Sequence, residues 1–386
     1  MTLTRAKTKA LEMARVENCE RGFPPPCYSA HKHTKMDPSL WSALPEHLVE
    51  RVLARLPIAS FFRFRSVCKS WNKLIVSPTF LQIYAEVPSQ EPWFWMFTDD
   101  DYRDGSTYDP TLNKWHHLPL PSLPSDEVFF PAAAAGGLVC LGCYDDGWKR
   151  FVVCNPLTRK WRELPPMLNP PFRLYTVGMV VDKESKTFKV LVAGTCEIYE
   201  IYDSSINCWK KTCILPPGFY RWHHSILCNG FLYSRRFQFD GLVAYDIRGG
   251  VWSQIQAPMP HAFDYHVLVE CQGKLYTVGG LVKNEMTRKI CILELQTSRL
   301  EWVEVDCMPS MLCEEFLKDG ASFSCTGYSD LVLIYVTEGL KDRMVVLYQL
   351  STRSWRRLPY CSLPDYRMKD GLLDGISFEP RLDATV

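Results

Sequence analysis

The hydrophobic residues of this chain follow a helical period near the N-terminus and a strand period over most of its length. Between residues 40 and 80 they recur at the spacing of one helix face, in Leu48, Val49, Val52, Leu53 and Leu56. Pro45 suits the first turn of this helix, because proline lacks the amide hydrogen that has no partner there. Pro57 is expected to end the helix, since its ring disrupts a helix interior.

Two further helices are expected before residue 80. Ser60 is a candidate cap for the second, ahead of Phe61, Phe62 and Phe64. The third should end before Pro78 after running through Val67, Cys68, Trp71, Leu74 and Ile75. The pattern therefore predicts a small three-helix unit.

From Pro92 onward the chain changes to short β runs, and one local frame repeats around six tryptophans: Trp115, Trp161, Trp209, Trp252, Trp302 and Trp355. Six residues before each tryptophan stands a turn-type or amide residue, namely Asp109, Asn155, Asp203, Asp246, Gln296 or Gln349. A tyrosine or apolar residue precedes that position, and a proline follows each tryptophan. The frame predicts a hairpin whose outer strand carries the tryptophan as an anchor.

The spacing of the tryptophans indicates how these hairpins assemble. Successive intervals are 46, 48, 43, 50 and 53 residues, and propeller blades repeat every ~40–50 residues. A single four-stranded sheet cannot bury both faces, so the units should pack radially. We expect an all-β propeller of about six blades. The last strand, Gly375 to Phe378, should close the ring against the blade that contains Trp93 and Trp115.

The expected domains are a flexible N-terminal arm over residues 1–37, the helical unit over 38–84 and the propeller over 85–386. The arm mixes charges of both signs, contains three consecutive prolines at 24–26 and lacks a sustained period.

Composition narrows the range of partners. A formal net charge of +1 gives no global attraction to nucleic acid or to acidic membranes. Residues 1–16 lack the apolar run of a signal peptide, and the uncharged stretch 128–144 is interrupted by Pro131 and a glycine pair. We therefore expect neither nucleic-acid nor membrane binding, a cytoplasmic or nuclear location, and reduced cysteines that act as small buried hydrophobes.

Motifs for catalysis and cofactor binding are missing from the sequence. It contains no P-loop, dinucleotide fingerprint, His-Glu-x-x-His or Gly-x-Ser-x-Gly. Cys140 and Cys143 are three apart in an expected strand, so they should point to opposite faces. The adjacent pairs His116–His117 and His223–His224 would diverge in the same way. No enzyme activity, cofactor or metal is expected.

The helical segment resembles the F-box. The resemblance consists of a Leu-Pro start and an R-x-V-C-K-x-W third helix, carried by Leu44, Pro45, Leu48, Val52, Leu53, Leu56, Pro57, Phe62 and residues 65–71. Residues 273–309, with Gly279, Gly280 and Trp302, resemble a kelch repeat. Residues 155–166 resemble the outer hairpin of plant F-box/kelch propellers. The whole chain thus looks like a plant F-box/kelch-repeat protein.

This resemblance implies the substrate-recognition subunit of a Skp–cullin–F-box ubiquitin ligase. The F-box would bind a Skp-type adaptor and through it a cullin. A partner is also expected on physical grounds, because a unit of about forty residues is too small to bury this many apolar side chains by itself. The residues expected to contact the adaptor, or to support that contact, are Leu44, Pro45, Leu48, Val52, Leu56, Val67, Cys68 and Trp71. Several of them could instead only close the helical core.

The propeller would bind an unknown protein substrate through loops on one face, because binding loops sit on rigid scaffolds. Two groups are candidates for exposed recognition loops: Arg221, Trp222, His223 and His224, and His261, Phe263, Asp264 and Tyr265. Two alternatives remain. One is a Skp-bound scaffold or transcriptional co-factor without ubiquitination. The other is a propeller metallo-oxidase with Tyr and His ligands converging on the axis.

Overall fold

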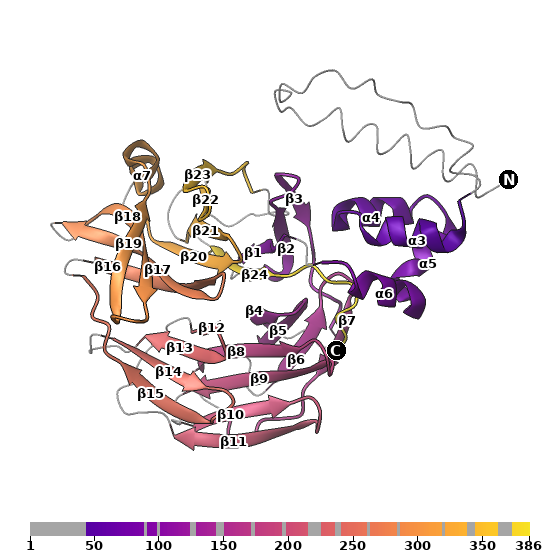
Figure 1. Ribbon diagram of the computed structural model, residues 1–386, viewed down its shortest axis with the longest axis horizontal. Helices are drawn as coiled ribbons and strands as arrows, with labels where there is room; N and C mark the ends of the chain where they lie inside the picture. The colour runs from indigo at the N-terminus through magenta and orange to yellow at the C-terminus, as the bar shows by residue number, and fades with distance from the viewer. Residues whose placement is uncertain are drawn as a thin grey trace. The chain divides into compact units, whose positions relative to one another are not determined.

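The computed structural model (Figure 1) describes residues 44–88, 91–98, 101–123, 129–143, 150–170, 174–194, 198–214, 225–235, 241–260, 263–283, 286–318, 321–337, 344–361 and 373–386. The predicted arm, residues 1–37, lies outside them. The chain divides into two compact units at Gln90–Glu91. Each unit is described separately below.

The first unit is helical. It comprises α3 (Glu46–Ala54), α4 (Ile58–Arg65), α5 (Lys69–Lys73), the 3-10 helix η1 (Leu74–Val76) and α6 (Pro78–Ala85). The predicted third helix is thus split into α5 and η1, and a further helix starts at Pro78, where the helical region was expected to stop. Proline is tolerated in a first helical turn, and the Ser77 hydroxyl accepts a hydrogen bond from the Phe80 amide.

The cap predicted for the second helix is wrong. Ser60 lies inside α4 and is buried, whereas Pro57 occupies the N-cap position. A stack between the rings of Phe61 and Phe80, with centroids 5.3 Å apart, joins α4 to α6. This unit therefore builds a small core of its own from aromatic and aliphatic residues.

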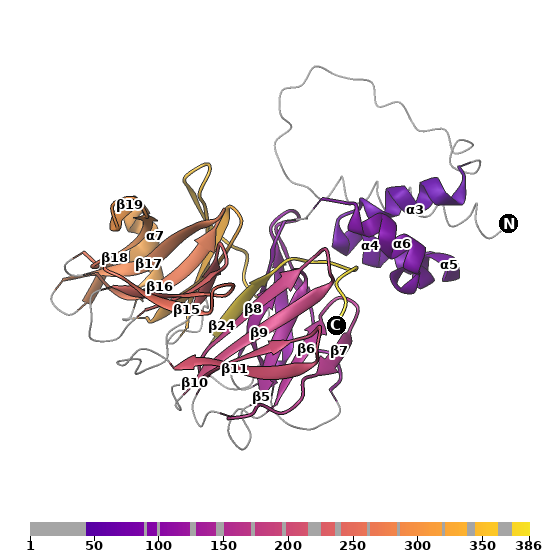
Figure 2. The ribbon, with the colours of Figure 1, turned by 60° about the horizontal axis from the view of Figure 1, so that its bottom comes forward.

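The second unit consists of six four-stranded antiparallel sheets, as predicted (Figures 1 and 2). Blade 1 contains β24 (Leu373–Phe378), β1 (Trp93–Thr98), β2 (Asp101–Asp109) and β3 (Lys114–His117), from the innermost strand outward. Blade 2 contains β4 (Phe129–Ala135), β5 (Leu138–Cys143), β6 (Phe151–Asn155) and β7 (Lys160–Glu163). Blade 3 contains β8 (Leu174–Asp182), β9 (Thr187–Gly194), β10 (Ile198–Asp203) and β11 (Cys208–Ile214).

The remaining blades follow the same order. Blade 4 contains β12 (Ile226–Cys228), β13 (Phe231–Arg235), β14 (Leu242–Asp246) and β15 (Val251–Ile255). Blade 5 contains β16 (Phe263–Cys271), β17 (Lys274–Lys283), β18 (Met286–Gln296) and β19 (Glu301–Cys307), and α7 (Ser310–Phe316) follows it. Blade 6 contains β20 (Phe323–Tyr328), β21 (Leu331–Val336), β22 (Val345–Gln349) and β23 (Ser354–Arg357).

The tryptophan frame forms the outer hairpin of every blade. Each tryptophan lies directly opposite the residue seven positions before it, in the pairs Tyr108–Trp115, Cys154–Trp161, Tyr202–Trp209, Tyr245–Trp252, Leu295–Trp302 and Tyr348–Trp355. The residue two before each tryptophan has a positive φ, in Asn113, Arg159, Asn207, Gly250, Leu300 and Arg353. The six turns therefore share one backbone conformation despite their different residues.

The tryptophans also connect neighbouring blades. Three of the indole Nε1 groups donate to a backbone carbonyl of the preceding blade in the ring: Trp115 to Pro359, Trp209 to Pro165 and Trp302 to Ala257. Hydrophobic clusters fill the spaces between blades beside them. Radial packing thus satisfies the indole and buries the sheet faces together.

The ring closes as predicted. β24 supplies the innermost strand of blade 1 and pairs antiparallel with β1, Trp93 lying opposite Phe378. Trp93, Phe94 and Trp95 are buried within β1. Joining the last strand to the first blade protects edges that would otherwise be open.

One expectation about the cysteines is wrong. Cys291 and Cys307 form a disulfide between β18 and β19, whereas all cysteines were expected to be reduced. The free cysteines among the described residues are buried or half-buried, as expected. Within the described part of the chain, no helix combines the length and the apolar character that a membrane crossing requires.

Candidate adaptor-binding and target-binding surfaces

One face of α3 carries apolar side chains that the helical unit does not cover. Leu48 and Val52, four residues apart, are 39 % and 42 % exposed, and Pro45 at the N-cap is also exposed. The next positions, Val49 and Leu53, are buried against the helical core. Because residues four apart share a helix face, Leu48 and Val52 form a continuous apolar strip.

The other predicted adaptor contacts are less accessible. Leu44, Leu56, Val67 and Cys68 are half-buried, and they lie at the ends of α3 or between α4 and α5. Trp71 is only 8 % exposed, and its ring packs edge-on against Phe64, with centroids 6.2 Å apart. Trp71 is therefore chiefly a residue of the helical core rather than an exposed adaptor contact.

Sequence reasoning missed Val76 as a surface residue. It ends η1 and is 61 % exposed, whereas Leu74 and Ile75 before it are buried. The apolar run Leu74–Val76 was visible in the sequence. A 3-10 turn changes which side chains share a face, so helical spacing could not assign Val76.

The propeller has two faces, which differ in what covers them. We call the "hairpin face" the one that carries the turns between β4 and β5 and between β6 and β7, with their counterparts in the other blades. We call the "connection face" the opposite one, where the outermost strand of one blade leads to the innermost strand of the next. The chain enters β1 at the hairpin face, because Trp93 pairs with the last residue of β24.

The C-terminal segment, residues 379–386, crosses the hairpin face from blade 1 to blade 2. The Asn155 side-chain amide donates to the carbonyl oxygens of Arg381 and Ala384, at 2.9 and 3.0 Å. Gly137, at φ 88°, leaves no room for a Cβ against the Arg381 side chain. The C-terminal segment therefore packs closely against the β4–β5 and β6–β7 turns of blade 2.

A buried charged residue anchors the start of the same segment. Glu379 is 2 % exposed, and its carboxylate accepts hydrogen bonds from the Lys183 ammonium at 3.2 Å and the Tyr328 hydroxyl at 3.3 Å. Burial raises the pKa of Tyr328, so its hydroxyl stays a neutral donor. These contacts link the tail to blades 3 and 6 and leave the connection face uncovered by it.

A central cavity of about 300 Å³ lies among the innermost strands of all six blades. Ser225, Glu270, Thr326, Asp374 and Ser377 contribute polar side chains to a lining that otherwise consists largely of alanine, valine and glycine. The Asp374 carboxylate accepts a hydrogen bond from the Tyr335 hydroxyl at 3.1 Å. The described lining includes tyrosines but no histidine, so it lacks the Tyr–His set that the metallo-oxidase alternative requires.

The predicted target-binding loops fall partly outside the described residues. Arg221, Trp222, His223, His224 and His261 all lie outside them, in the links from β11 to β12 and from β15 to β16. The prediction that Phe263 lies in an exposed loop is wrong, because Phe263 starts β16, is 7 % exposed and packs against the His266 ring. Asp264 and Tyr265 also belong to β16 rather than to a loop. Their side chains are not described, and the role of this group in binding stays a prediction.

Comparison with known proteins agrees with this architecture. Residues 41–83 match the family model of the F-box domain, and residues 95–374 match that of the F-box associated beta propeller domain. F-box only protein 6 of Arabidopsis thaliana is 36 % identical over 89 % of this chain and 75 % of its own length. Protein UNUSUAL FLORAL ORGANS of the same plant is 30 % identical over 91 % of this chain and 87 % of its own length.

A third relative is an F-box/kelch-repeat protein of Arabidopsis thaliana, which is 28 % identical over 89 % of this chain and 90 % of its own length. These matches span both the helical unit and the propeller, in the same order as in the structure. The chain therefore belongs to the F-box proteins that carry an F-box associated β-propeller, and its relatives are plant F-box/kelch-repeat proteins.

Proposed function

We propose that this protein is the non-catalytic substrate-recognition subunit of a Skp–cullin–F-box ubiquitin ligase. F-box domains generally bind Skp-type adaptors. The observation that carries the proposal is the strip of Leu48 and Val52 on α3, which the helical core leaves uncovered. Fully burying such a side chain contributes about 1.5–3 kcal/mol. Because about two fifths of each side chain is exposed, a partner that covers both would gain roughly 1–2 kcal/mol from their burial.

The propeller supplies the target-binding part of the proposal. The tail occupies part of the hairpin face, and the chain also enters the propeller there. We place target recognition on the connection face, around the mouth of the central cavity. The target would be a protein held close to a ubiquitin-charged enzyme, and proximity of this kind lowers a reaction barrier without any catalytic residue in this chain.

The adaptor step is tested with the full chain and a purified Skp-type adaptor. Leu48→Ala/Val52→Ala should weaken adaptor binding by about tenfold, because the lost burial is close to the ~1.4 kcal/mol that corresponds to tenfold. Val251→Ala, at an exposed valine on β15 of the propeller, is the matched control and should bind like the unchanged chain. Equal binding by all three proteins would remove α3 from the interface.

The ligase step needs a separate measurement. Affinity purification of the chain from plant cells should recover the adaptor together with a cullin, and the proteins recovered should accumulate when this chain is depleted. Recovery of the adaptor without a cullin, and without target accumulation, would instead favour the scaffold or transcriptional co-factor alternative.

A further inference from the structure

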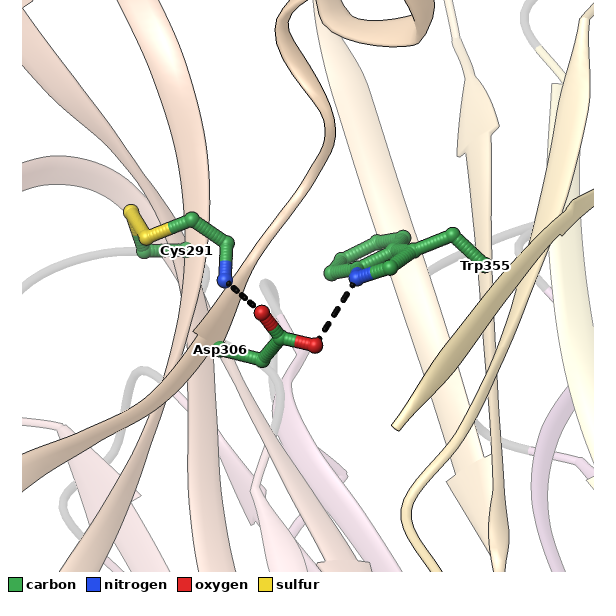
Figure 3. Close-up of a disulfide and its surroundings, with 4 residues drawn as sticks. Cys291, Asp306 and Trp355 are labelled. Atoms are coloured by element: carbon green, nitrogen blue, oxygen red, sulfur yellow. Dashed lines mark hydrogen bonds between the residues drawn. A yellow bond between two sulfur atoms is a disulfide. The ribbon is translucent and has the colours of Figure 1, made fainter. Parts of the chain in front are cut away.

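Three metal-ligating side chains converge on the outer hairpin of blade 5. Cys291 of β18 lies directly opposite Cys307 of β19, with Cα atoms 4.0 Å apart, and the two form a disulfide (Figure 3). The Glu304 carboxylate joins them, and its ligand atom and both sulfurs lie within 4.8 Å of one another. Among the described residues, no other group of three His, Cys, Asp or Glu side chains meets this criterion.

A β-bulge brings this set together. Residues three apart in a regular strand point to opposite faces, so Glu304 and Cys307 would normally diverge. The register shifts between the pairs Ile292–Asp306 and Leu293–Glu304, which leaves Val305 as an extra residue in β19. The bulge turns Glu304 and Cys307 to the same face, and re-aiming a side chain is a recurrent role of bulges.

The three side chains differ in burial, from fully buried to exposed. Cys291 is fully buried in the hydrophobic cluster between blades 4 and 5, which includes Ala257 and Ile255. Cys307 is half-buried and Glu304 is exposed. A metal ion here would have two sulfur ligands on the protein side and a carboxylate on the solvent side.

The opposite side of β19 holds Cys307 in place. The Asp306 carboxylate accepts a hydrogen bond from the Cys307 amide at 2.8 Å and another from the Trp355 indole of blade 6 at 3.1 Å (Figure 3). Asp306 thereby ties the ligand-bearing strand to the next blade. Such supporting hydrogen bonds orient ligands in metal sites.

We propose that Cys291, Cys307 and Glu304 form a zinc site in the reduced chain, and that the disulfide is its metal-free, oxidised form. Two thiolates and one carboxylate suit Zn²⁺ with water as the fourth ligand, whereas Ca²⁺ and Mg²⁺ require oxygen ligands alone. On binding, the two thiols release two protons to solvent as two zinc–sulfur bonds form.

Oxidation reverses the binding. A peroxide accepts two electrons from the two thiolates and takes up two protons, and its O–O bond breaks to give two waters when the peroxide is hydrogen peroxide. A sulfur–sulfur bond forms, both zinc–sulfur bonds break, and Zn²⁺ leaves. Glu304 alone cannot hold the ion, so zinc and the disulfide exclude each other.

The test is a zinc titration of the purified full chain, with a chromophoric chelator as competitor. The chain is first reduced with a phosphine, which is then removed. Reduced protein should take up one tightly bound Zn²⁺ that requires Cys307, and protein oxidised with hydrogen peroxide should lack it. Cobalt substitution should give a thiolate-to-metal charge-transfer band, which reports directly on sulfur ligation.

Variants identify the ligands. Cys307→Ser should abolish zinc binding at this site. Glu304→Gln should lower the zinc affinity by at least about tenfold, because even the loss of a residue that only supports a ligand lowers metal affinity by that factor. Both positions are at least partly exposed, so the fold should survive these substitutions. Cys291 is buried and is left unchanged. Cys208→Ser, at a half-buried free cysteine on the outer strand β11, and Glu301→Gln on β19 are matched controls that should keep full affinity.

Two results would overturn the proposal. One is a reduced chain whose zinc binding does not change with Cys307→Ser, including a chain that binds no zinc. The other is an oxidised chain, with its disulfide verified by mass spectrometry, that binds zinc as tightly as the reduced one.

Discussion

Glu270 lies near the end of β16, beside the central cavity, where it is half-buried. Burial raises the pKa of Glu270, and a hydrogen bond from the Gly273 amide, at 2.7 Å, opposes the rise only in part. A carboxyl whose pKa is higher in the folded state favours folding while protonated, and this contribution is lost as the pH rises through the folded pKa. Ionised Glu270 therefore costs stability at neutral pH.

Glu270→Gln should remove this pH dependence, because the amide is neutral and its oxygen can still accept the Gly273 hydrogen bond. We expect the variant to gain free energy of unfolding relative to the unchanged chain at pH 7, and to gain less at pH 4. Denaturant unfolding at both pH values measures the difference. Glu301→Gln, on the exposed strand β19, serves as control, and an identical offset at both pH values would contradict the assignment.

The six tryptophans show how far single positions could be predicted. Their spacing predicted outer-strand anchors, and all six lie on outer strands. What the indoles of Trp209 and Trp302 bind could not be predicted, because each acceptor belongs to the preceding blade, 44–45 residues earlier. A sequence repeat predicts where a residue lies within its own blade. Its hydrogen-bond acceptor in the neighbouring blade depends on how the blades pack around the axis.

At the scale of one element, α3 separates stability from binding. Leu53 is buried in the helical core and Leu48 lies on the exposed strip of the same helix. Both are leucines of one helix, so substitution to alanine changes helix propensity equally. The difference between the two variants therefore reports the environment of each side chain.

Leu53→Ala should lower the free energy of unfolding of the helical unit by about 2–5 kcal/mol, the usual range for a buried leucine. Leu48→Ala should change it by no more than about 0.5 kcal/mol, as expected for a surface position, while weakening adaptor binding. Thermal unfolding and adaptor titration of both variants test this pair. A large loss of stability in Leu48→Ala would show that this residue serves the core.

Two prolines of the helical unit have roles that could not be predicted from their own segments. Pro57 and Pro78 were taken as endpoints of helical segments, yet each stands at the start of a helix, as the N-cap of α4 and the first residue of α6. Proline disrupts a helix interior and suits a helix start, so its position alone allows either assignment. The contact between Phe61 and Phe80 shows why α6 forms, and that contact is tertiary.

At the scale of the whole molecule, the C-terminal tail extends the ring closure made by β24. Asn155 serves two purposes there. Its carbonyl oxygen caps the turn after β6 by accepting from the Leu157 and Thr158 amides, and its amide donates to the tail. Asp246 caps the equivalent turn of blade 4 in the same way, through the Arg248 and Gly249 amides.

Asn155→Ala should therefore destabilise the propeller more than Asp246→Ala does. We expect an extra loss of roughly 1–3 kcal/mol, the cost of leaving buried carbonyls without their donors. Hydrogen exchange of residues 379–386 should rise in Asn155→Ala and stay unchanged in Asp246→Ala. Equal stability loss with an equally protected tail would mean that Asn155 acts only as a turn cap.

The sequence by itself determined the order of the two domains, the six-blade count, the outer hairpins and the closing strand. Each of these depends on local periodicity or on a repeat, and neighbouring residues set both. The tertiary structure decided which of the F-box leucines and valines stay uncovered, which face of the propeller the tail occupies, and that Cys291, Cys307 and Glu304 meet. These features depend on contacts between segments far apart in the chain, or on a one-residue bulge that leaves no periodic signal.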